Sequence, residues 1–227
     1  MIYVMSDLHG CYDKYTAILE KIRFSEKDTL YILGDVVDRG DGGIRILQDM
    51  MQHPNIVPLL GNHDDWAQKI LRMLKNPKKE TLSKADMSLL QAWLSDGGKP
   101  TFTAFAGLSE EEQQSILAYL GSFGLYEELT VGDNRFFLAH SVPSKRKMQN
   151  LAARKPEDFT FSEPEYEKEY FPDIYIVTGH TPTSFIDPSS RGKIWHGNRH
   201  IAIDCGAVFG NPLACLCLDT MEKYYVG

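Results

Sequence analysis

The stretch TLYILGDVVDRG, residues 29–40, places a short apolar run directly before a charged turn that begins and ends with glycine. TLYIL (29–33) has the length and composition of a buried strand. GDVVDRG (34–40) then presents two aspartates and an arginine where that strand ends. Such a turn either closes a strand at the surface or forms the floor of a catalytic site, and the rest of the chain decides between these interpretations.

The same order of strand and helix repeats on both sides of this stretch. Apolar runs at 2–5, 29–33 and 55–60 alternate with helical patterns at 11–23 and 43–52. This alternation is typical of βαβ units, and it predicts an α/β fold with a parallel sheet.

The second half of the chain changes character twice. Residues 65–121 have a helical pattern, with breaks expected at 76–79 and 95–100. The chain then becomes rich in strands, beginning with a hairpin whose turn is GDN (132–134). Further strands are expected at 174–177, 193–196, 200–204 and 213–218.

The composition excludes several classes of protein. The 227 residues are 43% hydrophobic and 24% charged, which suits one well-buried globular domain. A net charge of −7 disfavours a stable nucleic-acid partner, because such proteins usually carry a basic surface. No apolar run reaches the length of a membrane span, and the chain opens directly into a strand. The four cysteines lack metal-finger and CxxC spacings, so we expect free thiols in a cytoplasmic protein without a membrane partner.

Polar residues that can bind metal ions follow each of five predicted strands. In open α/β sheets, ligands bind beyond the carboxyl ends of the strands. The residues at these ends are Asp7, His9, Asp35, Asn62, His140 and His180. A mixture of oxygen and imidazole ligands suits manganese, iron or zinc better than calcium. The set is large enough for two ions with positions left for water and substrate.

Each of these residues has a simpler interpretation when it is taken alone. A single histidine at a strand end is more often a surface residue than a ligand, and aspartate-rich turns are common in loops. Five turns with ligands of one chemistry are hard to obtain by chance, so the joint pattern predicts a dinuclear metal site. Asp7 and His9 are two residues apart, and an extended backbone would direct both to one side to share an ion.

The chain resembles the calcineurin-like metallophosphoesterases in motifs that occur in the family's order: DLHG (7–10), GDVVDRG (34–40), GNHD (61–64), His140 and GHTPT (179–183). More closely, it resembles the phosphoprotein phosphatases, in particular their compact bacterial branch, which includes symmetrical diadenosine-tetraphosphate hydrolases. Asp64 fits that branch, since the eukaryotic enzymes have glutamate at this position. The resemblance implies an α/β fold (α+β in some schemes), a four-layer α/β/β/α sandwich. We expect a single domain, 1–227, with a helical, lid-like insertion at about 65–124.

The resemblance also implies two divalent metal ions, manganese first, with iron or zinc as alternatives. Asp35 would bridge the two ions. The implied ligands of one ion are Asp7, His9 and Asp35, and those of the other are Asp35, Asn62, His140 and His180.

The implied catalytic residues lie in the second and third motifs. His63 would be the general acid that protonates the leaving-group oxygen, and Asp38 would orient it and raise its pKa. Arg39 would bind phosphate oxygens through its planar guanidinium group. Asp204 and Gly206 are candidates to line the site, although Asp204 is equally compatible with an ordinary turn after a strand.

The chain departs from the family pattern at FSEP (161–164), where relatives carry a second phosphate-binding arginine. Glu163 occupies that position, and an acid beside a phosphate would repel it. Arg146, in the basic cluster 144–147, and Arg154 are candidates to replace the missing cation. A solvated basic surface is the simpler interpretation of these arginines.

Three functions are compatible with these observations. The first expectation is a protein serine/threonine phosphatase, which hydrolyses phosphomonoesters by direct attack of a hydroxide activated by two metal ions. The alternative is a symmetrical dinucleoside-polyphosphate hydrolase or another small-nucleotide phosphatase. A weakly active metal-binding sensor module is the third, and Glu163 is the feature that points to it. Whether the substrate is a phosphoprotein or a small phosphorylated molecule depends on the pocket that the helical insertion forms.

Overall fold

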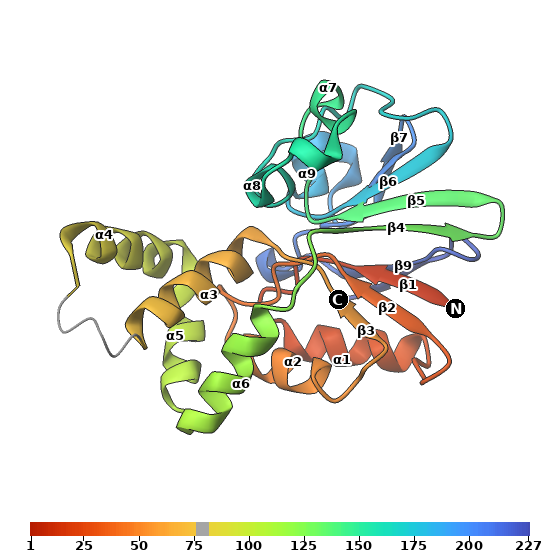
Figure 1. Cartoon of the computed structure of the whole chain (residues 1–227). Coiled ribbons are helices and arrows are strands. Elements are labelled where there is room, and N and C mark those ends of the chain that lie inside the picture. The colour runs from red at the N-terminus through yellow and green to blue at the C-terminus, as the bar shows by residue number, and fades with distance from the viewer. Residues whose placement is uncertain (76–81) are drawn as a thin grey trace.

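The computed structural model describes residues 1–75 and 82–227, so the helix break expected at 76–79 lies outside the described residues. The chain forms two five-stranded sheets that pack face to face, with helices on both outer faces (Figure 1). A further group of helices projects from one end of the sandwich. The predicted four-layer α/β/β/α class is confirmed.

The first sheet has the strand order β10-β9-β1-β2-β3. Its parallel part consists of β1 (Ile2–Met5), β2 (Thr29–Ile32) and β3 (Ile56–Pro58), as the βαβ pattern predicts. An antiparallel edge is added by β9 (Leu213–Cys217) and β10 (Lys223–Val226). The sequence does not predict β10, because its partly buried residues form no apolar run.

The second sheet has the order β4-β5-β6-β8-β7. β4 (Tyr126–Val131) and β5 (Asn134–Ala139) form the predicted hairpin. β6 (Ile174–Thr178) pairs in parallel with β5 and with β8 (His200–Ala202), and β7 (Trp195–Gly197) closes the edge antiparallel to β8.

An apolar core between the sheets joins them. Along β1, Val4 faces this core, whereas Tyr3 and Met5 face the helices on the other side, as the alternation of a strand requires. Val4 packs in one buried cluster with Phe136 of β5 and Ile201 of β8. Both faces of the first sheet are therefore buried.

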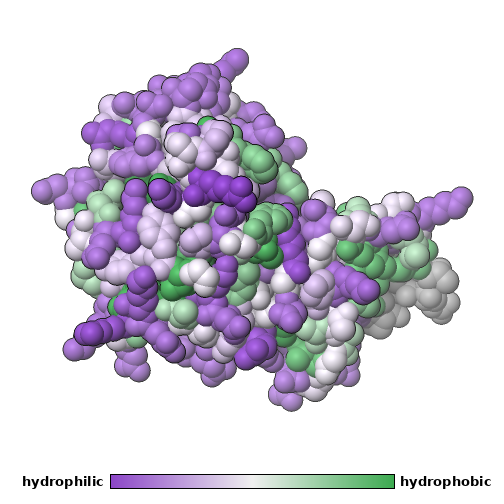
Figure 2. All heavy atoms as spheres, turned by 180° about the vertical axis from the view of Figure 1, so that it is seen from behind, coloured by the Kyte–Doolittle hydropathy of each residue, from purple (hydrophilic) through white to green (hydrophobic). Residues whose placement is uncertain are grey.

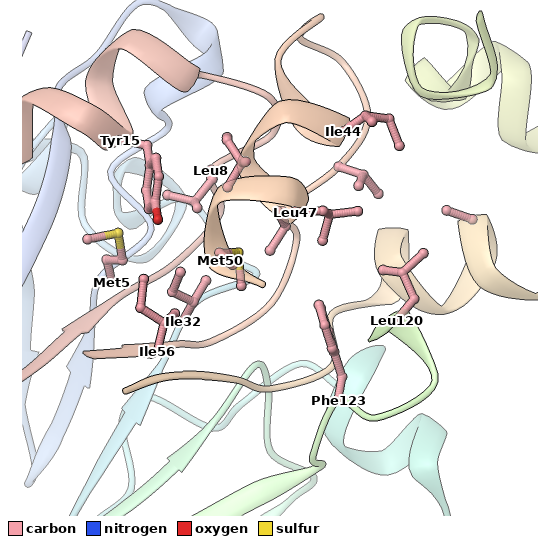
Figure 3. Close-up of a cluster of buried hydrophobic side chains, with 14 of the residues drawn as sticks. Met5, Leu8, Tyr15, Ile32, Ile44, Leu47, Met50, Ile56, Leu120 and Phe123 are labelled. Atoms are coloured by element: carbon pink, nitrogen blue, oxygen red, sulfur yellow. The ribbon is translucent and has the colours of Figure 1, made fainter. Parts of the chain in front are cut away.

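The outer face of the first sheet is covered by α1 (Tyr12–Lys21) and α2 (Gly43–Met50). Figure 3 shows Tyr15 of α1 and Leu47 and Met50 of α2 directed into the buried cluster that also contains strand residues. The helices between the first three strands thus supply the apolar layer that the parallel sheet needs.

The outer layer of the second sheet is built from short helices. They are α7 (Lys145–Met148), α8 (Pro156–Thr160), α9 (Thr183–Ile186) and the 3-10 turns η2 (Leu151–Ala153), η3 (Pro188–Ser190) and η4 (Ala207–Phe209). Met148 and Phe159 of this layer pack against Phe137 and Ile176 of the sheet.

The projecting group consists of α3 (Asn62–Leu74), α4 (Lys84–Trp93), α5 (Lys99–Ala106) and α6 (Glu110–Leu120). Seen from the opposite side, hydrophobic surface gathers on these helices (Figure 2). Within the described residues, none of the chain's helices has both the length and the apolar character that a membrane span needs.

The helix break expected at 95–100 is confirmed as a kink. A π-helical turn, η1 (Leu94–Gly98), connects α4 to α5, and Asp96 and Gly97 in it leave the helical region of backbone space. All four cysteines are free thiols, as expected.

Candidate active site

The six predicted metal ligands follow the carboxyl ends of strands in both sheets. Five of them are buried and His180 is half-buried. Asp7 and His9 follow β1, Asp35 follows β2, and Asn62 begins α3 after β3. His140 and His180 follow β5 and β6 of the second sheet. The site therefore joins the two sheets at one end of the sandwich.

The backbone at these positions is turned rather than extended. Asp7, His9, Asp35 and His180 have φ angles of 53°, 40°, 53° and 68°. Side-chain-bearing residues adopt this left-handed region rarely, and it persists only where the surrounding structure enforces it. The expectation that Asp7 and His9 share one side of an extended segment is wrong, because both lie in a left-handed turn.

Glycine allows the second and third motifs to approach each other closely. A Cβ atom on Gly34 would lie 2.4 Å from the backbone nitrogen of Gly61 and 3.0 Å from Nδ1 of His140. A Cβ atom on Gly61 would lie 2.2 Å from Oδ1 of Asp35. Any larger residue at either position would separate the two turns and move Asp35 from its place.

Four of the predicted ligands form one compact group. Oδ1 of Asn62 lies 3.0 Å from Nε2 of His140 and 3.0 Å from Nδ1 of His180, and the two imidazole nitrogens are 3.1 Å apart. Oδ1 of Asp35 lies 3.6 Å from Nε2 of His140. Metal bonds of about 2.1 Å at right angles place neighbouring donor atoms roughly 3 Å apart, so this spacing suits one ion.

The imidazoles present lone pairs to the site. Nδ1 of His140 lies 2.7 Å from the carbonyl oxygen of Leu33, and Nδ1 of His9 lies 3.0 Å from that of Val37. A carbonyl only accepts hydrogen bonds, so each Nδ1 carries the proton and each Nε2 is left as a lone-pair donor. This arrangement, in which a backbone carbonyl fixes the tautomer, is typical of metal-binding histidines.

The predicted metal ligands His9, His140 and His180 favour the neutral form of imidazole. Burial lowers the pKa of His9 and of His180 to about 4, and the neighbouring His140 adds to the effect on His180. Burial also lowers the pKa of His140. Neutral imidazole is the form that binds metal ions, so these three residues need not lose a proton near neutral pH.

Three carboxylates, those of Asp7, Asp35 and Asp204, are buried in the site. Burial raises the pKa of Asp7 well above its usual range, and the carboxylates of Asp204 and Asp35 raise it further. Burial also raises the pKa of Asp204 to about 7. Burial opposes ionisation of Asp35 too, but the surrounding imidazoles outweigh it and lower its pKa. Buried like charges of this kind are stabilised by bound cations.

The two oxygens of Asp35 point to different donor groups. Oδ1 faces His140 at 3.6 Å, and Oδ2 faces Nε2 of His9 at 3.5 Å. Potential ligand atoms cluster on both sides, as Asp35, His140 and His180 on one side and His9, Asp35 and His63 on the other. The donor types, the lone pairs and the shared carboxylate fit two divalent ions.

His63 forms a buried pair with Asp38. Its Nδ1 lies 2.8 Å from Oδ2 of Asp38, which also accepts a 2.7 Å hydrogen bond from the indole N–H of Trp93. The hydroxyl of Thr101 donates to Oδ1 of Asp38 at 2.7 Å. Burial lowers the pKa of His63, but the hydrogen bond to Asp38 and the charge of Asp35 outweigh it, so the net pKa is raised.

Arg39 lies between the two sides of the site. Its guanidinium donates from Nη1 to Nε2 of His9 at 2.8 Å and from Nη2 to Nε2 of His63 at 3.0 Å. Its backbone N–H donates to the carbonyl of Gly97 at 2.8 Å, so the kink after α4 anchors it. An imidazole nitrogen that binds a metal ion cannot also accept this hydrogen bond, so the guanidinium must turn away from His9 when that side is loaded.

Asp64 holds the turn of the second motif. It is fully buried and accepts backbone hydrogen bonds from Asp35 at 2.7 Å, from Val36 at 3.0 Å and from Gly61 at 3.2 Å. Burial raises its pKa to about 7, with a further contribution from Asp35. The turn that directs Asp35 into the site thus depends on this carboxylate.

The other predicted phosphate-binding residues, Arg146 and Arg154, have contacts within their own part of the chain. Arg154 lies 3.8 Å from Asp158, and its guanidinium also donates to a backbone carbonyl of its own segment. Arg146 is exposed and lines a surface hollow with Glu165. Glu163 is also exposed. A role for Arg146 or Arg154 in phosphate binding stays a prediction, and their observed contacts lie elsewhere.

Two residues that contact the predicted site, Trp93 and Thr101, escape sequence reasoning, and the structural role of Asp64 is not predicted. Trp93 and Thr101 lie more than fifty positions from Asp38 in the chain, and no local pattern links them to it. Asp64 is different, because an acidic residue three positions after Gly61 matches the capping pattern of a helix start. That pattern is the available signal for its structural role.

A four-layer sandwich whose strand ends carry this donor set defines the metallophosphoesterase class. The family model for calcineurin-like phosphoesterases matches residues 1–214, and the chain belongs to this family. The predicted family is therefore confirmed, and the structure places candidate His/Asp ligand groups for metal ions at the strand ends.

Known proteins show the same relationship in more detail. The symmetrical bis(5'-nucleosyl)-tetraphosphatase of Salmonella paratyphi C is 33% identical over 126 residues, which cover 52% of this chain and 42% of that protein. A crystal structure of a candidate diadenosine tetraphosphatase has a TM-score of 0.69 at 16% identity, covering 99% of this chain and 92% of the other. A protein serine/threonine phosphatase from Saccharomyces cerevisiae has a TM-score of 0.62 at 11% identity, covering 100% and 80%. The structural likenesses show the fold, and the sequence match spans less than half of the Salmonella protein.

Proposed function

We propose that this phosphoesterase hydrolyses dinucleoside polyphosphates and cleaves a substrate such as diadenosine tetraphosphate symmetrically into two nucleoside diphosphates. The observation that carries the substrate class is the similarity to a symmetrical bis(5'-nucleosyl)-tetraphosphatase over 126 residues. The sequence motifs alone favour a protein serine/threonine phosphatase. The relatives support the nucleotide alternative better, so we place it first.

The first part of the proposed mechanism is the binding of two divalent metal ions by the predicted ligands. Two divalent ions, when bound, supply Lewis-acid stabilisation and lower the pKa of water. Asp7, His9 and Asp35 would hold one ion, and Asp35, Asn62, His140 and His180 the other. Manganese is our first choice and iron or zinc the alternatives, because this donor set accepts several metals.

His63 donates a proton to the oxygen of the leaving group. Its raised pKa keeps it protonated closer to neutral pH, and Asp38 fixes the direction of its ring. Arg39 must also turn away from His63, because Nε2 of the protonated His63 carries the proton and cannot accept a hydrogen bond. Released from His9 and His63, the guanidinium binds the non-bridging phosphate oxygens. A water molecule supplies the oxygen of the new phosphate and the leaving group takes the proton, so no covalent enzyme intermediate is needed.

We also propose that residues 1–227 form one domain, with the helices at about 65–124 as a lid over one side of the site. Trp93 and Phe105 of these helices belong to the same buried cluster as Met5 of β1. The contact between Trp93 and Asp38 supports a role of this insertion in the site itself.

A substrate panel with the manganese-loaded protein tests this function. We expect diadenosine tetraphosphate to give two molecules of ADP by chromatography, and we expect phosphoserine and phosphothreonine peptides to react more slowly. The variant His63→Asn, assayed in parallel, should lose most of this activity because it lacks the proton donor.

Other products would favour another function. Efficient hydrolysis of phosphopeptides without ADP formation would restore the protein phosphatase. Inactivity toward every substrate, para-nitrophenyl phosphate included, with manganese, iron and zinc would favour the sensor module.

A further inference from the structure

A cavity of about 530 Å³ lies beside the active site, between α9 and the 3-10 turn η4. Phe185 of α9 and Phe209 of η4 both line it, together with Pro182, Arg191 and Gly206. The side chain of Phe185 is 81% exposed and that of Phe209 is 59% exposed. Two exposed phenylalanines around one hollow are unusual on a protein surface, where neighbouring apolar groups often mark a binding site.

One wall residue of the cavity, Phe209, also lies next to Arg39 of the active site. The ring of Phe209 lies 5.4 Å from Cζ of Arg39, the proposed phosphate ligand. Pro182 follows the proposed metal ligand His180 by two residues. Phe209 therefore lies both at Arg39 and at the cavity, so a ligand whose phosphate is bound by Arg39 would have its next groups close to the cavity.

The wall that carries Phe209 is held in place by backbone contacts. Nζ of Lys14 donates hydrogen bonds to the carbonyls of Ala207 at 3.1 Å and Asn211 at 2.6 Å. The side-chain amide of Asn211 donates to the carbonyl of Gly206 at 3.3 Å. The wall is thus formed before any ligand arrives.

The wall that carries Phe185 is attached to the same strand end. The backbone N–H of Thr183 donates to the carbonyl of Asp204 at 2.9 Å, and its hydroxyl donates to the carbonyl of Ser190 at 2.9 Å. Because both walls are fixed, a ligand that enters the cavity loses little free energy in ordering it.

We propose that this cavity binds the base and ribose of a nucleotide whose phosphates lie in the metal site, with the base stacked on Phe185 and Phe209. This inference rests on the proposed function and names the part of the chain that selects nucleotides. Every nucleobase has a flat π-face that stacks on aromatic side chains. The volume falls in the range of small-molecule sites, and the guanidinium of Arg191 in the lining offers N–H donors to the edge of the base or the ribose.

The binding of ADP and of pyrophosphate to the manganese-loaded full chain separates base contacts from phosphate contacts. We expect Phe185→Ala to weaken ADP binding about tenfold in calorimetry, which corresponds to about 1.4 kcal/mol. Pyrophosphate lacks a base, so its affinity should stay within twofold of wild type. Phe185→Tyr should bind ADP as wild type does, whereas Phe185→Leu, which is apolar but cannot stack, should resemble the alanine variant.

Phe102→Ala is the matched control, because this partly exposed phenylalanine lies on α5, outside the lining of the cavity. It should change neither affinity. Phe209→Ala is a second variant, on the opposite wall, and it should weaken the binding of ADP more than the binding of pyrophosphate.

Three results would overturn the nucleotide cavity. They are equal ADP affinity in Phe185→Ala and wild type, wild-type ADP binding no tighter than pyrophosphate binding, and a loss in Phe185→Ala confined to phosphopeptide hydrolysis. The last result would assign the cavity to a peptide side chain. Failure of the proposed function is a separate result, since it is read from the absence of ADP production by wild type.

Discussion

The indole N–H of Trp93 donates a 2.7 Å hydrogen bond to Oδ2 of Asp38, the same oxygen that pairs with Nδ1 of His63. The helical insertion therefore holds the carboxylate that orients the proposed general acid. Trp93 is fully buried, and a Cβ atom on Gly98 would lie 2.3 Å from its ring. The kink after α4 thus provides the space in which the indole reaches the site.

We predict that Trp93→Phe lowers kcat about tenfold and leaves KM nearly unchanged. Phenylalanine keeps most of the packing but removes a hydrogen bond to a charged group, a contact that contributes about 1.5–3 kcal/mol. Steady-state kinetics with diadenosine tetraphosphate measure the change. Trp195→Phe, in β7, is the control, and an equal loss of kcat in both variants would contradict a positioning role for Trp93.

The pKa of His63 should depend on Asp38. In wild type the hydrogen bond to Asp38 and the charge of Asp35 raise this pKa above its ordinary value of 6.5 despite burial. The variant Asp38→Asn lacks the negative charge that opposes the effect of burial, so the pKa of His63 should fall. NMR titration of the histidine signals in chelator-treated protein measures it, with assignment from His63→Asn.

The sign of this shift sets the pH dependence. Because the pKa of His63 is raised on folding, its contribution to stability is fully present below pH 6.5 and is lost as the pH rises through the folded pKa. His63 also stops acting as a proton donor as the pH rises through its pKa. The decrease of kcat at alkaline pH should therefore begin at lower pH in Asp38→Asn. If the alkaline decrease of kcat stays at the same pH in Asp38→Asn, it arises from the titration of a group other than His63.

The number of bound metal ions should fall further when Asp35, the ligand shared by both ions, is substituted than when His180, a ligand of one ion, is substituted. Asp35 faces both donor groups, whereas His180 belongs to one. We expect Asp35→Ala to reduce bound manganese from about two ions per chain to well below one, and His180→Ala to reduce it to about one. Elemental analysis after dialysis measures this, and equal content in the two variants would contradict a bridging Asp35.

Substitution of Asp64 should lower the stability of the fold more than substitution of the adjacent Asp65. Asp64→Ala leaves buried backbone N–H groups without an acceptor, and we expect the free energy of unfolding to fall by about 3 kcal/mol. For a chain of this length that corresponds to a decrease in Tm of roughly 6–12 °C. Asp65→Asn, which removes an ion pair with the partly exposed Lys69, should cost less than about 1 kcal/mol. A calorimetric scan in which both variants melt together would contradict the role of Asp64.

Much of the site is predictable because its residues follow strands directly in the chain. The alternation of apolar runs and helices before residue 60 implies a parallel sheet, and the carboxyl ends of parallel strands meet at one edge. Asp35 and Asn62 are therefore neighbours for a reason visible in the sequence. The kink at 95–100 is likewise signalled by its two consecutive glycines.

Other features depend on contacts that no local pattern encodes. The left-handed backbone at Asp7 and His9 arises because the first motif packs against the second, with the N–H of His9 donating to the carbonyl of Asp35 at 2.8 Å. The edge strand β10 pairs through its backbone, which carries little compositional signal. The placement of Glu163 and Arg154 depends on the path of a loop, and sequence spacing does not describe that path.

The amino-acid sequence by itself determined the parallel βαβ units at the start of the chain, the family and the chemistry of the ligands, because each follows from residues that are close in the chain. The tertiary structure decided which distant residues complete the site. It brought Trp93 and Thr101 to Asp38 and placed Phe185 and Phe209 around one cavity beside Arg39. The physical reason is that these contacts arise from the packing of helices and turns on the finished sandwich, where separation in space no longer follows separation in sequence.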